Sequence, residues 1–250
     1  MKAASAEGIM KIYEKIKAAP LGGLTKKEIT VAFLGDSVTQ GCFEVYRVGE
    51  NGVDTVHDYD ASFAYRFRSI MNLLYPDMQV NVVNAGISGD GTENGVARIG
   101  KDILEKNPDL LVLSYGLNDC FGGKDGIGRY AANIASMVKQ AKEKGIDVIY
   151  LTQNCMNTQV SPLITDPFLR TLAENFSAVQ KSGVLGEYFA AGKAAAEGEG
   201  AVVLDLYPVW EKLIASSCNV TELLSNKLNH PVREYHVYVA IKLIETIFGV

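Results

Sequence analysis

A serine directly after a short apolar run is the first residue whose type and position suggest chemistry. Residues 31–34 are Val-Ala-Phe-Leu, and Gly35-Asp36-Ser37 follows at once. The continuous apolar run predicts a buried parallel strand that ends at a tight turn. Open α/β sheets bind ligands beyond the carboxyl ends of their strands, so Ser37 stands where such a fold would place a nucleophile. A serine that merely caps the following helix explains this stretch equally well.

Two more segments place polar groups after neighbouring predicted strands. A glycine-rich stretch containing Gly89 follows the predicted strand at 80–85, and Asn118 follows the one at 110–114. Right-handed crossovers bring the carboxyl ends of parallel strands to one edge, so both residues are expected beside Ser37. The backbone N–H groups of Ser37 and Gly89 and the amide of Asn118 would then be three donors for the oxyanion of a tetrahedral intermediate.

A serine nucleophile also needs a base, and the chain contains three histidines. His230 precedes Pro231 in a turn beyond the last predicted strand and is the predicted base. His57 lies in a polar segment and is expected to be solvated. His236 lies within the last predicted helix beside apolar neighbours and is expected to be packed in the core.

Four segments together resemble the sequence blocks of the SGNH (GDSL) hydrolases: residues 35–37, 84–90, 116–119 and 230–231. Each block alone is weak, but four in the right order, three of them directly after a strand, make a specific signal. The resemblance covers about residues 31–245. It implies a flavodoxin-like three-layer α/β/α fold and ester hydrolysis through an acyl-serine. It further implies Ser37 as nucleophile and His230 as base, an oxyanion hole of Ser37, Gly89 and Asn118, and structural roles for Asp36 and Asp119.

One position departs from the family. Its members usually carry Asp three residues before the histidine, and here that residue is Lys227. A carboxylate there would orient the imidazole and stabilise its charged form, which an ammonium cannot do. Three replacements are open: a neutral oxygen of Asn226 or Ser225, a backbone carbonyl that leaves a Ser-His dyad, or Asp205 after the last strand. The sequence favours a dyad with a neutral acceptor, and a catalytically inactive binding protein is the alternative.

The rest of the chain predicts one α/β domain over residues 1–250, with a five-stranded parallel sheet between helix layers. Strands are predicted at 30–35, 80–85, 110–114, 147–151 and 201–205, and helices at 63–74, 93–106, 127–144, 168–180, 184–197, 207–224 and 233–248. An N-terminal extension over 1–29 contains a helix predicted at 7–19, ended by Pro20 and Gly22-Gly23. Residues 44–60 and 153–167 are predicted to be irregular, and long connections of this kind often act as lids or binding loops.

Composition excludes several classes of function. The net charge of −5 over 250 residues offers no basic face for nucleic acid. No apolar run approaches the ~18 residues of a membrane span, and the N-terminus lacks a signal peptide, so the chain is expected in the cytoplasm. The four cysteines are expected to be free thiols, and no spacing indicates a metal, a nucleotide-phosphate loop or another cofactor. The possibility of a homo-oligomer stays open.

The expected partner is a small ester. Asp58, Tyr59, Asp60, Asn154 and Asn157 in the two predicted irregular segments suit hydroxyl groups better than a long acyl chain. With the family analogy, this favours removal of an acetyl group from an acylated carbohydrate or related metabolite. A lysophospholipid or a thioester, the other substrates considered, would call for more Leu and Phe in those segments.

Overall fold

The structure, a computed structural model, describes residues 10–18, 27–50 and 52–250. At its centre is a sheet of five parallel strands in the order β4-β1-β5-β6-β7. The strands are β1 (Glu28–Gly35), β4 (Gln79–Gly86), β5 (Leu110–Ser114), β6 (Asp147–Leu151) and β7 (Val202–Leu204). Counted along the chain among these five, the order is 2-1-3-4-5, that of flavodoxin-like folds. The predicted five-stranded parallel sheet is confirmed.

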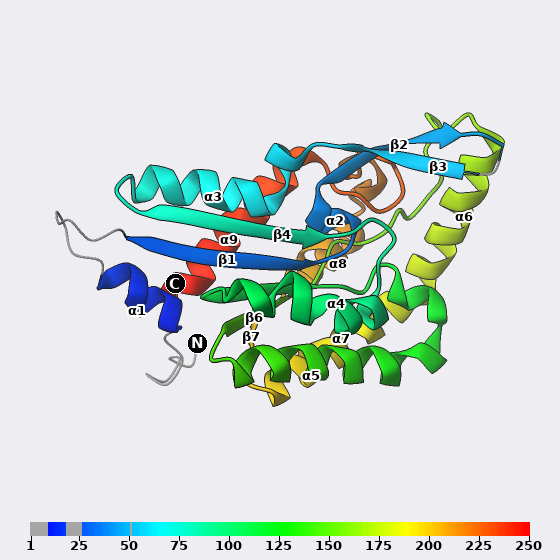
Figure 1. Cartoon of the computed structure of the whole chain (residues 1–250). Coiled ribbons are helices and arrows are strands. Elements are labelled where there is room, and N and C mark those ends of the chain that lie inside the picture. The colour runs from blue at the N-terminus through cyan, green and yellow to red at the C-terminus, as the bar shows by residue number, and fades with distance from the viewer. Residues whose placement is uncertain (1–9, 19–26, 51) are drawn as a thin grey trace.

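Helices cover both faces of this sheet (Figure 1). On one face α3 (Phe63–Leu74) packs against α9 (Arg233–Phe248). On the other, α5 (Ile127–Glu143) packs against α4 (Thr92–Asp102) and α7 (Val184–Gly198). Two further helices, α6 (Pro167–Ser182) and α8 (Tyr207–Ala215), follow β6 and β7. The predicted three-layer α/β/α arrangement is confirmed.

The burial of the strands explains why their sequences are so apolar. β5 and β6 are buried throughout, and so is the second half of β1, where Ala32, Phe33 and Leu34 have no exposed surface. The outer strands β4 and β7 are mostly half-buried. A central strand between two helix layers has no face toward water, so it reads as a continuous apolar run.

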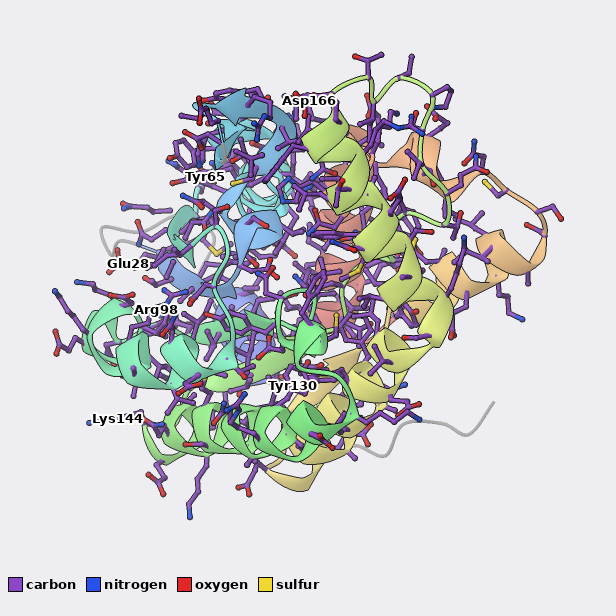
Figure 2. The ribbon with its side chains drawn as sticks, turned by 90° about the vertical axis from the view of Figure 1, so that its right-hand side faces the viewer. Glu28, Tyr65, Arg98, Tyr130, Lys144 and Asp166 are labelled. Carbon is purple, nitrogen blue, oxygen red and sulfur yellow. The ribbon has the colours of Figure 1, made fainter. Side chains whose placement is uncertain are left out.

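The polar segment predicted to be irregular at 44–60 instead contains a β-hairpin. Strand β2 (Cys42–Val48) pairs in antiparallel fashion with β3 (Gly52–His57), and the hairpin extends away from the central sheet (Figure 1). Its far end lies near the start of α6, which Asp166 marks in Figure 2. There Arg47 pairs with Asp166 at 3.5 Å. The segment at 153–167 is irregular, as predicted, until α6 begins at Pro167.

Two predicted helices end early. The helix predicted at 207–224 is divided: α8 ends at Ala215, Ser217 has a left-handed backbone with φ of 63°, and a 3-10 turn covers Val220–Leu223. A helix cannot continue through such a residue. The helix predicted at 93–106 likewise ends at Asp102, and a 3-10 turn follows at Leu104–Lys106.

The described part of the N-terminal extension packs on the rest of the chain. Its helix α1 (Lys11–Lys17) buries Ile12 and Ile16, and the Ile12 N–H donates to the Asp147 carboxylate at 2.9 Å. Residues 7–9 of the predicted helix, and its predicted end at Pro20 and Gly22-Gly23, lie outside the described residues.

Candidate active site

Ser37 is the first residue of a four-residue helix, α2 (Ser37–Gln40), directly after β1. The cap of this helix is Asp36, whose carboxylate accepts from the Val38 N–H at 3.0 Å. A side chain at Gly35 would collide with Thr39 and with the Ser114 carbonyl, so only glycine allows this close turn. Because Asp36 caps the helix, the Ser37 hydroxyl is available to another partner.

That partner is His230. The imidazole Nε2 lies 2.8 Å from Ser37 Oγ, and Nδ1 lies 2.9 Å from the backbone carbonyl oxygen of Phe43. A carbonyl can only accept, so the ring proton is assigned to Nδ1, which leaves Nε2 able to accept from the Ser37 hydroxyl. This is the tautomer that a general base needs. Burial lowers the pKa of His230 to about 4, against smaller opposing effects of the Phe43 carbonyl and the Glu44 carboxylate.

A hydrogen-bonded turn holds the His230 backbone. Asn226 Oδ1 accepts from the N–H groups of Leu228, Asn229 and His230 at 2.9–3.0 Å. Ser225 donates from its backbone N–H to the His230 carbonyl at 2.7 Å. Asn226 and Ser225 therefore fix the turn, and neither is the acceptor that faces the imidazole.

The third side-chain candidate is also engaged elsewhere. Asp205 accepts from the Thr152 hydroxyl at 2.8 Å and forms an ion pair with Lys193. Lys227, at the position of the family's carboxylate, pairs with Glu222 at 3.0 Å. Of the replacements considered for that carboxylate, the structure contains the backbone carbonyl, because the chain at Phe43 lies against the imidazole.

The sheet register places the predicted oxyanion donors at the same edge as Ser37. Gly35 pairs with Gly86 at the end of β4 and with Ser114 at the end of β5. Gly89 and Asn118 follow these two strand ends within four residues. Gly89 has a φ of +77°, a conformation that favours glycine.

Asn118 is held by one of its two amide hydrogens, because Nδ2 donates to the Asp90 carbonyl at 2.7 Å. Among the described residues, its second N–H has no hydrogen-bond partner. Gly89 and Asn118 both border a cavity of about 240 Å³ between the start of α4 and α5. The other side chains on its walls are largely polar and include Thr92, Asn94, Arg129, Asn133 and Tyr188.

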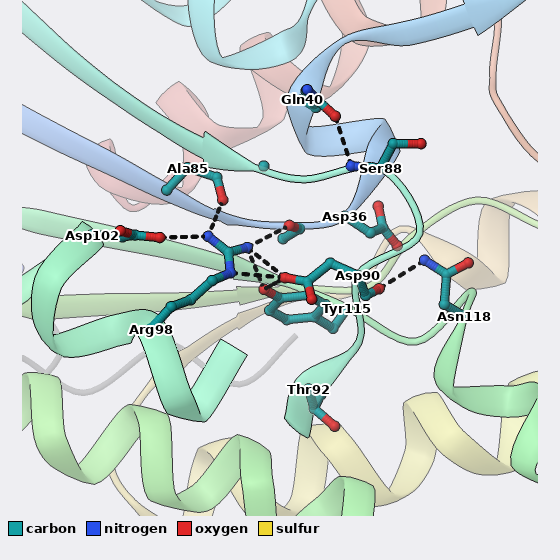
Figure 3. A network of polar contacts seen from close by, with 12 residues as sticks. Asp36, Gln40, Ala85, Ser88, Asp90, Thr92, Arg98, Asp102, Tyr115 and Asn118 are labelled. Atoms are coloured by element: carbon teal, nitrogen blue, oxygen red, sulfur yellow. Dashed lines mark hydrogen bonds and ion pairs between the residues drawn. The ribbon is translucent and has the colours of Figure 1, made fainter. Parts of the chain in front are cut away.

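Arg98 joins these segments and was not singled out from the sequence (Figure 3). Its guanidinium donates to the carbonyls of Gly35 at 3.1 Å and Ala85 at 2.6 Å, at the ends of β1 and β4. It also donates to the Asp90 carboxylate at 2.8 Å, and the Asp90 carbonyl holds Asn118. One partly buried cation thus connects three segments of the site. The sequence signal was an arginine within a predicted helix beside the glycine-rich stretch.

The remaining histidines lie as their neighbours indicated. His236 is buried, its Nδ1 accepts from the Phe63 N–H at 3.0 Å, and its ring lies against Phe43 and Phe63. Burial lowers its pKa to about 3. His57 is exposed at the end of β3.

Two of the residues predicted to bind substrate hydroxyl groups are instead structural. Asn154 and Asn157 are almost fully buried and donate to backbone carbonyls, Asn154 to Asn229 at 2.7 Å and Asn157 to Ala173 at 2.9 Å. Asp58 forms an ion pair with Arg233 at 2.8 Å.

Within residues 10–18, 27–50 and 52–250, no group of three His, Cys, Asp or Glu side chains could hold a metal ion. None of the helices described is long and apolar enough to cross a membrane. The four cysteines are free thiols.

Known esterases are similar in sequence to part of this chain. Esterase TesA of Pseudomonas aeruginosa is 30% identical over 119 residues, which are 47% of this chain and 56% of that protein. An acetylxylan esterase of Geobacillus stearothermophilus is 26% identical over 129 residues, 48% of this chain and 57% of that protein. The chain thus spans little more than half the length of these curated relatives.

Solved structures share the fold over a larger part. Axe2, an acetylxylan esterase from Geobacillus stearothermophilus, superposes with a TM-score of 0.64 at 20% identity, covering 89% of this chain and 95% of that chain. A two-domain esterase (CEX) active on acetylated mannans gives 0.64 at 19%, covering 96% of this chain and 52% of the other. The profile of the GDSL-like Lipase/Acylhydrolase family matches residues 33–232, a span that includes Ser37, Gly89, Asn118 and His230. The chain therefore belongs to the GDSL-like lipase/acylhydrolase family, the SGNH hydrolases.

Proposed function

We propose that the protein is a serine esterase that hydrolyses a carboxylic ester through an acyl-serine intermediate. The observation that carries this proposal is the 2.8 Å contact between Ser37 Oγ and His230 Nε2, with the opposite ring nitrogen held by a carbonyl. A hydroxyl is a weak nucleophile until a neighbouring base removes its proton, and this geometry supplies that base.

The reaction follows from the residues at the sheet edge. Ser37 Oγ attacks the ester carbonyl carbon while His230 Nε2 takes the hydroxyl proton. The N–H groups of Ser37 and Gly89 and the amide of Asn118 stabilise the resulting oxyanion, and one such donor is typically worth ~3–4 kcal/mol of barrier. His230 then gives its proton to the departing alcohol. Water, deprotonated by the same imidazole, releases the acid and restores Ser37.

A backbone carbonyl and a nearby carboxylate stabilise the charged imidazole that forms during each step. The Phe43 carbonyl accepts from Nδ1, and the Glu44 carboxylate favours the charged ring; both raise the pKa of His230 against the larger effect of burial. Phe43 and Glu44 together take the part that a carboxylate at position 227 plays in other family members.

For the substrate we assign a small acetylated carbohydrate or a related acylated metabolite. The cavity that Gly89 and Asn118 border measures about 240 Å³, a size that suits a sugar unit or a short acyl group and not a long chain. Ser37 and His230 are not among its lining residues, so the two proposed oxyanion donors connect it to the reacting groups. Its polar walls favour hydroxyl groups. The names of the acetylxylan esterase and of the esterase active on acetylated mannans point the same way.

The test combines active-site labelling with a series of esters. A fluorophosphonate probe should label the wild type and the His57→Ala control, since His57 is exposed, and should not label Ser37→Ala. Removal of the nucleophile should lower kcat by about 10⁴-fold or more. p-Nitrophenyl acetate and acetylated xylo-oligosaccharides should be hydrolysed faster than p-nitrophenyl esters whose acyl chains have about eight or more carbons.

Two outcomes would overturn this proposal. A folded wild type that the probe does not label would be a binding protein with the scaffold of an esterase. A strong preference for long acyl esters or thioesters would replace the carbohydrate substrate with a lysophospholipid or an acyl thioester.

A further inference from the structure

Gln153 is a buried residue that joins two segments of the site. It follows the end of β6 by two residues and is only 4% exposed. Its Nε2 donates to both carboxylate oxygens of Asp36 at 2.9 Å. Its Oε1 accepts from the Leu117 backbone N–H at 3.1 Å. Both ends of this one amide are therefore engaged.

The two partners of Gln153 each precede a residue of the proposed mechanism. Asp36 is followed by Ser37 and caps the helix that Ser37 begins. Leu117 is followed by Asn118. A nucleophile and an oxyanion donor must be held within about 0.5 Å of their productive separation, and residues that fix their backbones control that separation.

We propose that Gln153 is a positioning residue for ester hydrolysis, which holds the turn carrying Ser37 in register with the segment carrying Asn118 through the Asp36 carboxylate. This inference rests on the esterase function proposed above. Gln153 touches neither the nucleophile nor the base, so it acts through Asp36 and Leu117.

The electrostatics of Asp36 make the contribution of Gln153 measurable. Burial raises the pKa of Asp36 to about 7, the donors Gln153 and Val38 oppose this effect, and the carboxylates of Asp119 and Asp90 add to it. The nearby Cys42, Tyr115, Cys120 and Tyr130 are uncharged near neutral pH because burial raises their pKa values. No Lys or Arg in the described part of the chain forms an ion pair with Asp36.

An acid limb of activity near pH 7 would therefore report Asp36 and not the base, because the pKa of His230 lies at about 4. The ionised carboxylate is the form that accepts from Val38 and Gln153 together. Protonation removes one acceptor and loosens the connection to Gln153. Loss of the Gln153 donor should move the same limb to higher pH.

The experiment compares Gln153→Leu with Gln180→Leu. Gln180 is a matched control: it is buried, accepts from the Met156 N–H at 2.8 Å and donates to the Tyr207 hydroxyl at 3.0 Å, away from Ser37. In Gln153→Leu, kcat should fall about 10- to 100-fold with KM within about threefold, and the acid limb should rise by about one pH unit. Gln180→Leu should lose stability but keep the wild-type kcat and acid limb.

A third variant, Gln153→Glu, separates positioning from a merely structural role. The introduced carboxyl keeps an oxygen for the Leu117 N–H, and it can donate to Asp36 only while the pair shares a proton. Activity should then be recovered at lower pH and lost as pH rises, which reverses the pH dependence of Gln153→Leu. Simple loss of packing at position 153 would produce no such reversal.

A carboxyl-carbon NMR titration of Asp36 in the wild type and in Gln153→Leu supplies a readout that needs no substrate. The Asp36 carboxyl should titrate at higher pH in the variant. An active wild type whose kcat, acid limb and Asp36 titration are unchanged in Gln153→Leu would overturn this inference alone. A wild type without esterase activity would overturn the proposed function and this positioning role together.

Discussion

The imidazole of His230 is oriented by the main chain, through the Phe43 carbonyl. Residue type carries no information about such a contact, since every residue has a carbonyl and Phe43 lies 187 positions away in the sequence. The motifs therefore predicted the nucleophile and the base, but the sequence could not identify the group that orients the imidazole. The structure also explains why Lys227 is tolerated, because its ammonium pairs with Glu222.

Replacement of Lys227 should have little effect on catalysis. Because Nδ1 of His230 already has an acceptor, both Lys227→Ala and Lys227→Asp should keep kcat/KM within about threefold of the wild type. Loss of the partly exposed ion pair with Glu222 should change the stability by about 1 kcal/mol or less. Steady-state kinetics on p-nitrophenyl acetate checks this. A tenfold rise in kcat for Lys227→Asp alone would mean that a carboxylate at this position reaches the imidazole.

Other residues of the site could not be predicted from the sequence, for a related reason. Gln153 and Arg98 act through hydrogen bonds to backbone groups and carboxylates of distant segments. Asn154 and Asn157 looked like substrate-binding residues because the type of a polar residue does not reveal whether it faces solvent or a buried carbonyl.

Among the elements, the β2–β3 hairpin contacts the imidazole directly, because β2 contains Phe43. Arg233, the first residue of α9, forms ion pairs with Glu44 at 2.6 Å and Asp58 at 2.8 Å. Its guanidinium also lies 4.2 Å from the centre of the Phe43 ring. The base of the hairpin is therefore attached to the helix that begins just after His230.

Arg233→Met should impair catalysis by freeing the Phe43 segment. We expect kcat to fall about tenfold with a smaller change in KM, since substrate contacts are retained. High salt should reduce wild-type kcat in the same direction but less, because Arg233 is about a third exposed (33%) and its ion pairs are partly screened.

Arg47→Met is the matched control for that variant. Arg47 lies on the same hairpin but pairs with Asp166 and stacks on Phe168, at the end far from His230. Steady-state kinetics of Arg233→Met and Arg47→Met on one acetate ester shows which end of the hairpin catalysis depends on. Equal losses of kcat would mean that the whole hairpin is needed, and that its attachment at Arg233 has no special role.

The central strands could be predicted because burial on both faces leaves a continuous apolar sequence. The hairpin could not, because neither of its faces is buried along its length and the apolar Val48, Val53 and Val56 are exposed among polar neighbours. The break after α8 depends on the left-handed backbone of Ser217, for which a serine gives no sequence signal.

At the scale of the whole molecule, two buried histidines and one buried aspartate have opposite effects on how the stability depends on pH. His230 and His236 have pKa values of about 4 and 3, below the ordinary 6.5, so the unfolded chain binds their protons first and acid destabilises the fold. Asp36, with a pKa of about 7 against the ordinary 3.8, is protonated in the folded state first. Between the two pKa values of Asp36, 3.8 and about 7, proton uptake by the folded state therefore stabilises the fold. This effect offsets the destabilisation that one of the two histidines causes.

Asp36→Asn should remove that offset. Between about pH 4.5 and 6, the free energy of unfolding should fall more steeply with acid than in the wild type, by about 1.4 kcal/mol per pH unit, the equivalent of one proton. Urea unfolding at several pH values measures this slope. Asp77→Asn, at an exposed position, should keep the wild-type slope. Equal slopes for Asp36→Asn and the wild type would contradict a protonated Asp36 in the acidic fold.

The contact between His230 and a main-chain oxygen also affects how activity can be judged from sequence and by mutagenesis. An alanine scan would find no third participant, because exchanging the Phe43 side chain leaves its peptide oxygen in place. A filter that demands an acidic residue ahead of the histidine would discard this chain as inactive. Such proteins are better screened by reactivity toward an organophosphorus reagent than by the identity of one acidic position.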